Sequence, residues 1–375
     1  MKSQAAVLYE MGRKAPFGAS KPLAIEEVEV GAPGPREVVV KVAAAGLCHS
    51  DLSVIDGSRP RPMPMLLGHE AAGVVHQVGP DVTDLAVGDH VVFSFLPMCG
   101  RCISCATGRP VMCSNGAKAN AAGTTLGGAK RFCNAKGEPL HHHLGVSAFS
   151  QYTVAAQESL IKIPSDLPLE TAALFGCAVI TGVGAVLNTA NVTPGMSVAV
   201  FGMGGVGLAA VMGAKLAGAY PIVAVDLLDA KLQLAKACGA SHVVNASGDV
   251  VSAIKDATTG GADVTIEAVG SAKVLAQAYG ATARGGTTVT VGLPHPEQQL
   301  AIQAVSLVAE ERTLKGSYMG SAVPKRDVLK YISLYRAGLL PVEKLYSGSI
   351  ELPKINEAFD ALAKGEVVRN VLRFA

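Results

Sequence analysis

The sequence has little net charge of either sign. Its 375 residues include 32 lysines and arginines against 30 aspartates and glutamates, which gives a formal net charge of +2. No run of like charges occurs, and the aromatic residues, 5% of the chain, lack the spacing of a base-stacking platform. We therefore expect neither a nucleic-acid partner nor an anionic membrane partner.

The N-terminal segment lacks the long apolar region and small-residue cleavage site of a secretory signal. We therefore expect a cytoplasmic location, in which clustered cysteines indicate metal binding rather than disulfides. Residues 171–214 contain no charged residue, a length that could span a bilayer. Asn188, Asn191, Pro194 and several glycines interrupt this stretch. It therefore predicts a buried parallel strand and the helix that follows it.

The length and the 49% content of hydrophobic residues predict two domains with sizeable cores. Up to about residue 178, short apolar runs between Gly and Pro breaks, such as 38–42 and 73–78, predict mixed β structure. From residue 197 strands alternate with helices, which predicts an α/β unit with a parallel sheet. The expected strands are 197–201, 222–225, 242–244, 264–268 and 287–291, with helices at 206–217 and 229–238.

The tail after about residue 318 is expected to return to the first domain. The predicted boundaries are thus 1–178 with 318–375 for a β-rich catalytic domain, and 179–317 for a coenzyme domain.

A G-x-G-x-x-G motif follows the strand at 197–201 and opens the next helix. In that context it predicts a dinucleotide cradle, because glycines let the backbone approach a pyrophosphate at a helix N-terminus. Asp226 ends the second strand nineteen residues after Gly207. A carboxylate there accepts hydrogen bonds from ribose hydroxyls and repels a 2′-phosphate, which favours NAD over NADP. The cradle residues are Gly202, Gly204, Gly205, Val206 and Gly207.

Four cysteines lie within fifteen positions, at Cys99, Cys102, Cys105 and Cys113. Four thiolates can close a tetrahedron around zinc, which is typical of a structural site. An iron–sulfur cluster is the alternative, but its pattern normally ends in Cys-Pro, whereas Ser114 follows Cys113.

A second set of chemically active residues is dispersed along the chain. It comprises the segment Cys48-His49-Ser50-Asp51, the segment Gly68-His69-Glu70, and Cys177. Spacing alone does not link them, since a lone buried Cys or His is more often a core residue.

Over nearly its full length, the chain resembles the zinc-containing medium-chain alcohol dehydrogenases, in their longer, dimeric liver-like branch. The segments that carry the resemblance are those around Cys48, His69, Cys99 to Cys113, Cys177, Gly202 to Gly207 and Asp226. The resemblance implies a GroES-like catalytic domain and a Rossmann doubly wound coenzyme domain. It also implies a homodimer joined through the edge strand of the coenzyme sheet.

The resemblance also implies residue roles. The catalytic zinc would be held by Cys48, His69 and Cys177, with Glu70 behind it, Asp51 orienting His69 and Ser50 bonding the substrate hydroxyl. The cofactor would meet His49 and Arg369 at its pyrophosphate, Lys231 at its adenosine ribose, and Thr181, Val291 and Leu293 at its nicotinamide. Phe95 would line the substrate pocket. Cys–His–Cys with an open fourth position suits Lewis-acid chemistry on an alcohol oxygen, and a second-shell carboxylate fixes the histidine tautomer.

The predicted function is NAD-linked, zinc-dependent oxidation of a primary alcohol, aromatic or medium-chain, with two zinc ions per subunit. Glutathione-dependent formaldehyde dehydrogenase is the alternative within the family. That branch carries an arginine shortly after the last structural cysteine, where this chain reads 114–117 Ser-Asn-Gly-Ala, and an acidic residue where Arg59 stands. A non-enzymatic dinucleotide-binding protein is the other alternative, although such proteins often lose the catalytic ligands.

Three further features are interpreted. The run His141-His142-His143 is expected to form a polar surface loop, and Cys133 and Cys238 are expected to be isolated.

Many relatives place a proton-accepting histidine three residues after Ser50, where this chain has Ser53. We therefore expect a truncated proton relay from Ser50 through the cofactor ribose to water. The alternative is that Ser53 caps a turn and another base serves the ribose.

Overall fold

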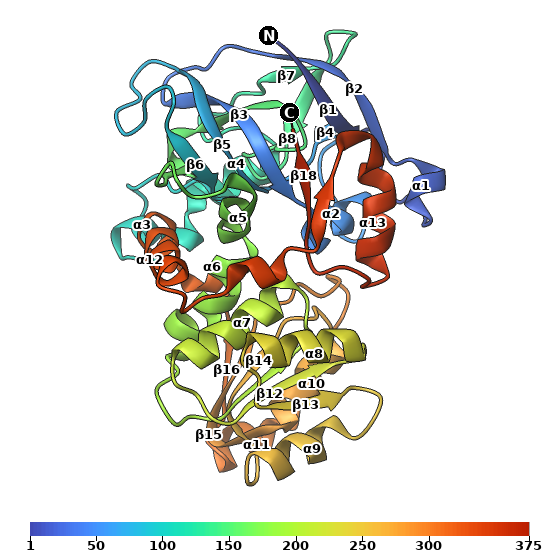
Figure 1. The fold of residues 1–375 in the computed structure, drawn as a ribbon, viewed down its shortest axis with the longest axis vertical. Helices are drawn as coiled ribbons and strands as arrows, with labels where there is room; N and C mark the ends of the chain where they lie inside the picture. The colour runs from blue at the N-terminus through green and yellow to red at the C-terminus, as the bar shows by residue number, and fades with distance from the viewer. Residues whose placement is uncertain (375) are drawn as a thin grey trace. The chain divides into compact units, whose positions relative to one another are not determined.

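The computed structural model describes residues 1–374. These residues divide into two compact units. The first comprises 1–177, 323–329 and the tail from 346, and the second comprises 178–322 and 330–345. Figure 1 shows mostly strands in the blue part of the chain, helices beside strands in the yellow part, and helices α12 and α13 in the red part.

The first unit is built from two antiparallel-rich β layers. One is a closed barrel of strands in the order β1-β2-β7-β8-β4, and the other is a sheet in the order β10-β6-β5-β3-β18-β17, to which β9 adds on β3. The bounds are β1 Lys2–Leu8, β2 Leu23–Val30, β3 Glu37–Gly46, β4 Met65–Leu66, β5 Glu70–Val78, β6 His90–Phe93, β7 Phe132–Cys133, β8 Pro139–His142, β9 Tyr152–Ala156, β10 Leu160–Lys162, β17 Gly348–Ile350 and β18 Asn370–Arg373.

Helices of the first unit are short and connect these strands. They are α1 Phe17–Ser20, α2 His49–Ile55, α3 Ile103–Ala106, α4 Ser114–Ala122, α5 Leu169–Ala173 and α13 Ile355–Ala363, with 3-10 turns η1 Pro110–Met112, η2 Gln157–Ser159, η3 Leu174–Gly176 and η7 Leu352–Lys354. The barrel core is apolar and includes Val7, Val39, Phe132 and Leu140. The tail lies in the first unit, where Val371 of β18 pairs with Gly46 of β3.

The second unit is a six-stranded parallel sheet in the order β13-β12-β11-β14-β15-β16. This is the doubly wound order 3-2-1-4-5-6, in which nucleotides bind at the carboxyl ends of the strands where the order reverses. The strands are β11 Val198–Phe201, β12 Ile222–Asp226, β13 His242–Asn245, β14 Ala262–Glu267, β15 Thr282–Thr290 and β16 Thr313–Gly316. The helices are α6 Ala178–Gly184, π-helical η4 Ala185–Ala190, α7 Gly205–Leu216, α8 Asp229–Cys238, α9 Val250–Ala257, α10 Ala272–Gly280 and α11 Ala304–Ala309, with 3-10 turns η5 Met319–Ser321 and η6 Val342–Leu345.

The strands and helices predicted after residue 197 are all present in the second unit. The unit boundaries differ from those expected, since 318–322 and 330–345 belong to the second unit and the division falls within α12, Pro324–Arg336. Local packing explains the difference. Asn188 donates to the Gly320 carbonyl at 3.2 Å, and Lys344 donates to the carbonyl of Ala237 in α8.

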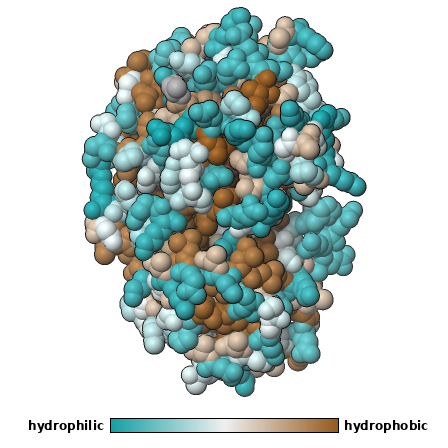
Figure 2. Space-filling model, turned by 45° about the vertical axis from the view of Figure 1, so that its right-hand side comes forward, coloured by the Kyte–Doolittle hydropathy of each residue, from teal (hydrophilic) through white to brown (hydrophobic). Residues whose placement is uncertain are grey.

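The uncharged stretch 171–214 contains β11 and α7 as predicted, but its first part is helical. Among the described residues no single helix is both long and apolar enough to cross a membrane, although the bent pair 169–176 and 178–190 meets the criteria of length and composition. Every residue of α6 is buried, which is typical of a core helix. On the face drawn in Figure 2, hydrophilic side chains are widespread and hydrophobic ones gather in the lower half.

Candidate metal centres and cofactor cradle

The four-cysteine cluster forms around α3 and the turn that leads into α4. The sulfur atoms of Cys99, Cys102, Cys105 and Cys113 all lie within 4.8 Å of one another. A tetrahedral zinc with Zn–S bonds of about 2.3 Å needs sulfur separations of about 3.8 Å, and the Cys102 and Cys113 sulfurs are 3.9 Å apart. The donor set therefore fits a closed zinc site.

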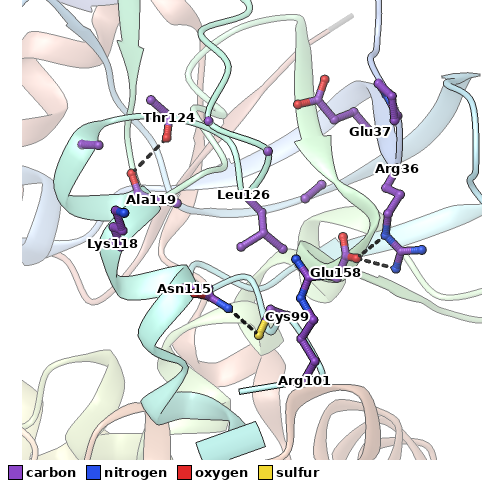
Figure 3. Close-up of a pocket in the computed structure, with 15 residues that line it drawn as sticks. Arg36, Glu37, Cys99, Arg101, Asn115, Lys118, Ala119, Thr124, Leu126 and Glu158 are labelled. Atoms are coloured by element: carbon purple, nitrogen blue, oxygen red, sulfur yellow. Dashed lines mark hydrogen bonds and ion pairs between the residues drawn. The ribbon is translucent and has the colours of Figure 1, made fainter. Parts of the chain in front are cut away.

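Nitrogen donors surround these sulfurs. Backbone N–H groups of Cys99 and Gly116 donate to Cys113 Sγ at 3.4 and 3.3 Å, and Asn115 Nδ2 donates to Cys99 Sγ at 3.2 Å. Figure 3 shows this Asn115–Cys99 contact at the rim of a cavity of about 780 Å³. Hydrogen bonds from the backbone around Cys105 lower the pKa of Cys102 to about 6, whereas burial raises the pKa of Cys105 to about 12. The cluster thus stabilises thiolate at one of its sulfurs even without a metal ion.

The large cavity in Figure 3 is not the predicted substrate pocket. It borders Cys99 and Arg101 and not Cys48, His69 or Cys177. Two of its charged lining residues pair with each other, since Arg36 binds Glu158 at 2.5 Å.

The fold brings together the dispersed residues Cys48, His69 and Cys177. Cys48 is the N-cap of α2, His69 precedes β5 and Cys177 precedes α6. Their ligand atoms lie within 4.8 Å of one another, with Cys177 Sγ 3.5 Å from His69 Nε2. The three residues are 6%, 1% and 6% exposed, respectively. Three inward-facing donors of this kind fit a zinc ion with one open position.

Hydrogen bonding within the cluster favours ionisation of one thiol. The hydrogen bond from Cys177 lowers the pKa of Cys48 well below its usual value, while burial opposes that shift and Arg369 reinforces it. One sulfur is thereby prepared as a thiolate ligand, the form that binds metal.

Asp51 is fully buried beside this cluster. Its Oδ1 lies 3.0 Å from His69 Nδ1 and accepts from the Gly68 N–H at 3.2 Å, and its Oδ2 accepts from the Cys48 N–H at 3.2 Å. The contact with Nδ1 leaves Nε2 for a metal ion, as in the carboxylate–histidine–zinc arrangement.

Glu70 and Arg369 form a buried pair behind the cluster. Glu70 Oε1 is 3.2 Å from Arg369 Nε, and Arg369 Nη1 also donates to the Leu47 carbonyl at 2.6 Å. Burial raises the pKa of Glu70 to about 7 against the opposing effect of Arg369. A side chain at Gly46 would come within 2.3 Å of Glu70 Oε1, so glycine makes room for this carboxylate.

Three other predicted site residues differ in their burial and in their contact with the cluster. The ring of Phe95 packs edge-on against His69, with centroids 5.5 Å apart, which places an apolar wall beside the cluster. Ser50 is half-buried in the first turn of α2, and His49 is exposed. Ser53 Oγ donates to the His49 carbonyl at 2.9 Å, a bond to the residue four positions earlier within α2 and not a cap of a helix end.

The glycine motif forms a tight turn between β11 and α7. Gly202 has φ +89°, and a side chain at Gly207 would come within 1.7 Å of the Gly202 carbonyl oxygen. Asp226 accepts from the Met203 N–H of this turn at 2.7 Å and from the Leu228 N–H at 3.0 Å. The predicted acid thus ends β12 directly beside the glycine turn.

Other predicted cofactor residues lie in the same unit. A side chain at Gly202 would meet Val269, and one at Gly270 would meet the backbone of Leu293, so the 269–270 loop connects the glycine turn to Leu293. Lys231 is half-buried on α8, Val291 follows β15, and Thr181 is buried in α6. Sequence reasoning missed Glu267, whose buried carboxylate holds the 269–270 loop. An acid ending the apolar strand 264–268 is the signal that could have identified it.

The surface loop predicted at 141–143 is wrong for two of its histidines, because His142 and His143 are 0% and 1% exposed. His142 ends β8, where its Nε2 accepts from the Arg131 N–H at 3.1 Å and its ring contacts Phe132. Burial lowers the pKa of His142 to about 3, so it is a neutral core residue. His143 faces Asp51, 3.2 Å away. The Arg131 N–H beside His142 and the Asp51 carboxylate beside His143 make the burial of the two rings possible.

Family models match both units. The alcohol dehydrogenase GroES-like domain matches residues 34–165, and the zinc-binding dehydrogenase model matches residues 205–336. An alcohol dehydrogenase zinc-binding domain protein from Burkholderia ambifaria is 38% identical with a TM-score of 0.94, and the match covers 100% of this chain and 99% of that one. The chain belongs to the zinc-containing medium-chain alcohol dehydrogenase family.

Two further solved structures are similar to this chain over its full length. Benzyl alcohol dehydrogenase from Acinetobacter calcoaceticus is 34% identical with a TM-score of 0.93, and all of both chains is covered. A zinc-binding-dehydrogenase-type protein from Sinorhizobium meliloti 1021, bound to NADP, is 25% identical with a TM-score of 0.81 over all of both chains. The family makes this chain an oxidoreductase of the zinc-dependent alcohol dehydrogenase type, with a GroES-like and a Rossmann-like part.

Proposed function

We propose that this protein is an NAD-linked alcohol dehydrogenase that holds a catalytic zinc through Cys48, His69 and Cys177 and a structural zinc through Cys99, Cys102, Cys105 and Cys113. The convergence of the three dispersed donors within 4.8 Å carries this proposal, because spacing along the sequence does not bring them together. Glu70 lies behind this donor set, paired with Arg369, and is the outer carboxylate of the site.

When bound, the catalytic zinc supplies a Lewis acid that lowers the pKa of an alcohol hydroxyl. The chain supplies the geometry around it. Asp51 fixes His69 in the tautomer with Nε2 free, and the edge-on Phe95 ring excludes water from one side. Ser50 Oγ would accept the alcohol proton while passing its own proton toward the cofactor ribose and water, and the bound nicotinamide would supply the hydride acceptor.

The coenzyme specificity follows from Asp226 in this proposal. Its carboxylate ends β12 beside the glycine turn, where it would bond the adenosine ribose hydroxyls and repel a 2′-phosphate. Lys231 would reach the same ribose, Thr181, Val291 and Leu293 would frame the nicotinamide, and His49 and Arg369 would contact the pyrophosphate. In the structure Arg369 is engaged by Glu70, so its pyrophosphate role requires a shared or rearranged side chain.

The proposed substrate is a primary alcohol with an aromatic or medium-length apolar group. Phe95 beside the metal site supports it, as does the likeness to a benzyl alcohol dehydrogenase at 34% identity. The formaldehyde dehydrogenase alternative is not favoured, since Asn115, in the stretch where that branch carries its arginine, donates to Cys99.

We further propose a cytoplasmic homodimer with no nucleic-acid or membrane partner. The edge position of β16 supports a dimer formed by continuation of the sheet, and Val305 and Val308 of the nearby α11 are 69% and 82% exposed. Light scattering that shows a monomer or a tetramer would exclude this assembly.

One assay tests the proposed reaction. Zinc-loaded protein is supplied with NAD and a panel of aliphatic and aromatic alcohols, and the same panel of aldehydes is run with NADH. We expect turnover in both directions and the largest kcat/KM for apolar alcohols. Absence of turnover with every substrate would support the dinucleotide-binding alternative instead.

A further inference from the structure

The Asp51 carboxylate has one more neighbour than the orientation of a metal-binding histidine requires. Besides the His69 ring and two backbone N–H groups, His143 Nδ1 lies 3.2 Å from Asp51 Oδ1. Asp51 and His143 are both buried, with side-chain exposures of 0% and 2%. His143 comes from the segment after β8, far from α2 and β5 in sequence.

The nitrogen that faces Asp51 has no second partner. Among the described residues, His143 Nδ1 is a buried polar atom that makes no hydrogen bond of ordinary geometry, and Asp51 Oδ1 lies 3.2 Å from it. Leaving a buried N–H or a buried lone pair unpaired costs about 1 to 3 kcal/mol. A proton on Nδ1 directed at the carboxylate oxygen avoids that loss, whereas a proton on Nε2 would set a lone pair against a negative oxygen.

The backbone after His143 is held in a conformation that ordinary residues avoid. Leu144 has φ +54° and Ser147 has φ +52°, with Gly145 at +66° between them. Each non-glycine residue in this region costs on the order of 1 kcal/mol, and such residues cluster where a side chain must be held in place. The His143 N–H donates to Ser147 Oγ at 2.9 Å, which closes the turn.

The two histidine rings also touch each other. His69 and His143 meet edge to face with centroids 5.5 Å apart, and Phe95 makes the same contact with His69. His69 is therefore fixed by two rings and one carboxylate, and the carboxylate is shared with His143.

We propose that His143 is a positioning residue of the catalytic metal site: its Nδ1–H donates to Asp51, and this second histidine donor locks the carboxylate that orients His69. This inference rests on the proposed function, because it requires zinc at Cys48, His69 and Cys177. In this role His143 acts through Asp51.

The test measures zinc release to a chromophoric chelator from the full-length, zinc-loaded protein. His143→Phe keeps a ring of similar size against His69 and removes the nitrogen. We expect zinc to leave the catalytic site about tenfold faster, as for other lost outer-shell partners, while release from the four-cysteine site is unchanged. The catalytic phase is assigned as the one missing in Cys177→Ser.

A conservative variant and a matched control separate positioning from packing. His143→Asn can place an amide N–H near the position of Nδ1, so release should return to within about threefold of the wild-type rate. His142→Phe makes the same exchange one residue earlier, in the barrel core, and should lower thermal stability without changing catalytic zinc release. Equal acceleration by His142→Phe would mean that general loosening, not the Asp51 contact, sets the rate.

A measurement on the wild type keeps the inference testable if the variants do not fold. Long-range ¹⁵N–¹H NMR of the His143 ring should show the Nδ1–H tautomer, and an Nε2–H tautomer would overturn the proposal.

The outcomes also separate this inference from the proposed function. If the wild type binds only one zinc ion, both the proposed function and this inference are refuted. Two zinc ions with unchanged release in His143→Phe would overturn the inference alone. If the wild type binds three ions and His143→Phe loses one of them, His143 is a metal ligand and its positioning role is overturned.

Discussion

The two cysteine-containing clusters of the first unit differ in how the chain assembles them. Cys99, Cys102, Cys105 and Cys113 come from one short segment, and three of them are partly exposed. Cys48, His69 and Cys177 come from three distant segments and are all buried. Local spacing thus suffices for a cluster that stabilises its own loop, whereas a cluster that leaves a position open for chemistry needs a whole domain around it.

The largest expected effect comes from breaking the dispersed cluster. Cys177→Ser should remove the catalytic ion and lower kcat/KM by at least about 10³-fold, since the Lewis acid supplies several kcal/mol. Native mass spectrometry should find one zinc per chain instead of two. Cys238→Ser, which changes a buried cysteine outside both clusters, should retain both ions and the activity. Full activity in Cys177→Ser would refute the ligand assignment.

Breaking the local cluster should instead affect folding first. Cys102→Ser should lower the free energy of unfolding by about 4 kcal/mol or more, because a structural zinc contributes folding free energy. Thermal unfolding with and without chelator measures this, and activity per folded molecule should stay near that of the wild type. An iron–sulfur chromophore in anaerobically purified protein would show that this cluster does not hold zinc.

A smaller effect is expected in the second unit, which contains neither cluster. The wild type should prefer NAD. Asp226→Gly should lower the ratio of kcat/KM with NAD to kcat/KM with NADP by about tenfold, or 1.4 kcal/mol, because a carboxylate no longer faces the 2′-phosphate. Asp229→Asn, a neutralisation three residues away on α8, should leave the ratio within about twofold. A wild-type preference for NADP would contradict the assignment.

The smallest expected effect concerns proton transfer near α2. Ser53 bonds the His49 carbonyl and cannot act as a base near neutral pH. A histidine titrates at about 6.5, so Ser53→His should raise alcohol oxidation at neutral pH several-fold and reduce its dependence on buffer concentration. The wild type should favour alkaline pH. An unchanged pH–rate profile, with a deuterium isotope effect showing that hydride transfer limits the rate, would indicate that another base serves the relay.

Features set by neighbours in sequence could be predicted from the chain alone. The four-cysteine cluster, the glycine turn, Asp226 and the alternation of strands and helices all depend on short-range spacing. The joining of Cys48, His69 and Cys177 required the family resemblance, because nothing local connects them. His142 and His143 were misplaced, since their polarity predicts exposure and only the completed fold reveals their buried partners. The boundary between the units inside α12 was also missed. The sequence of a helix does not indicate with which unit each of its turns packs.

The pairing of β18 with β3 has a consequence for synthesis. During translation Gly46 is made 325 residues before its partner Val371, and Arg369, the partner of buried Glu70, emerges at the same late stage. All six strands of the second unit are made by Gly316 and the rest of that unit by Leu345, so the second unit can begin to fold while the first still has an open sheet edge and an unpaired carboxylate. Until β18 has emerged, the nascent first unit therefore presents an unpaired sheet edge that is open to aggregation and to chaperones.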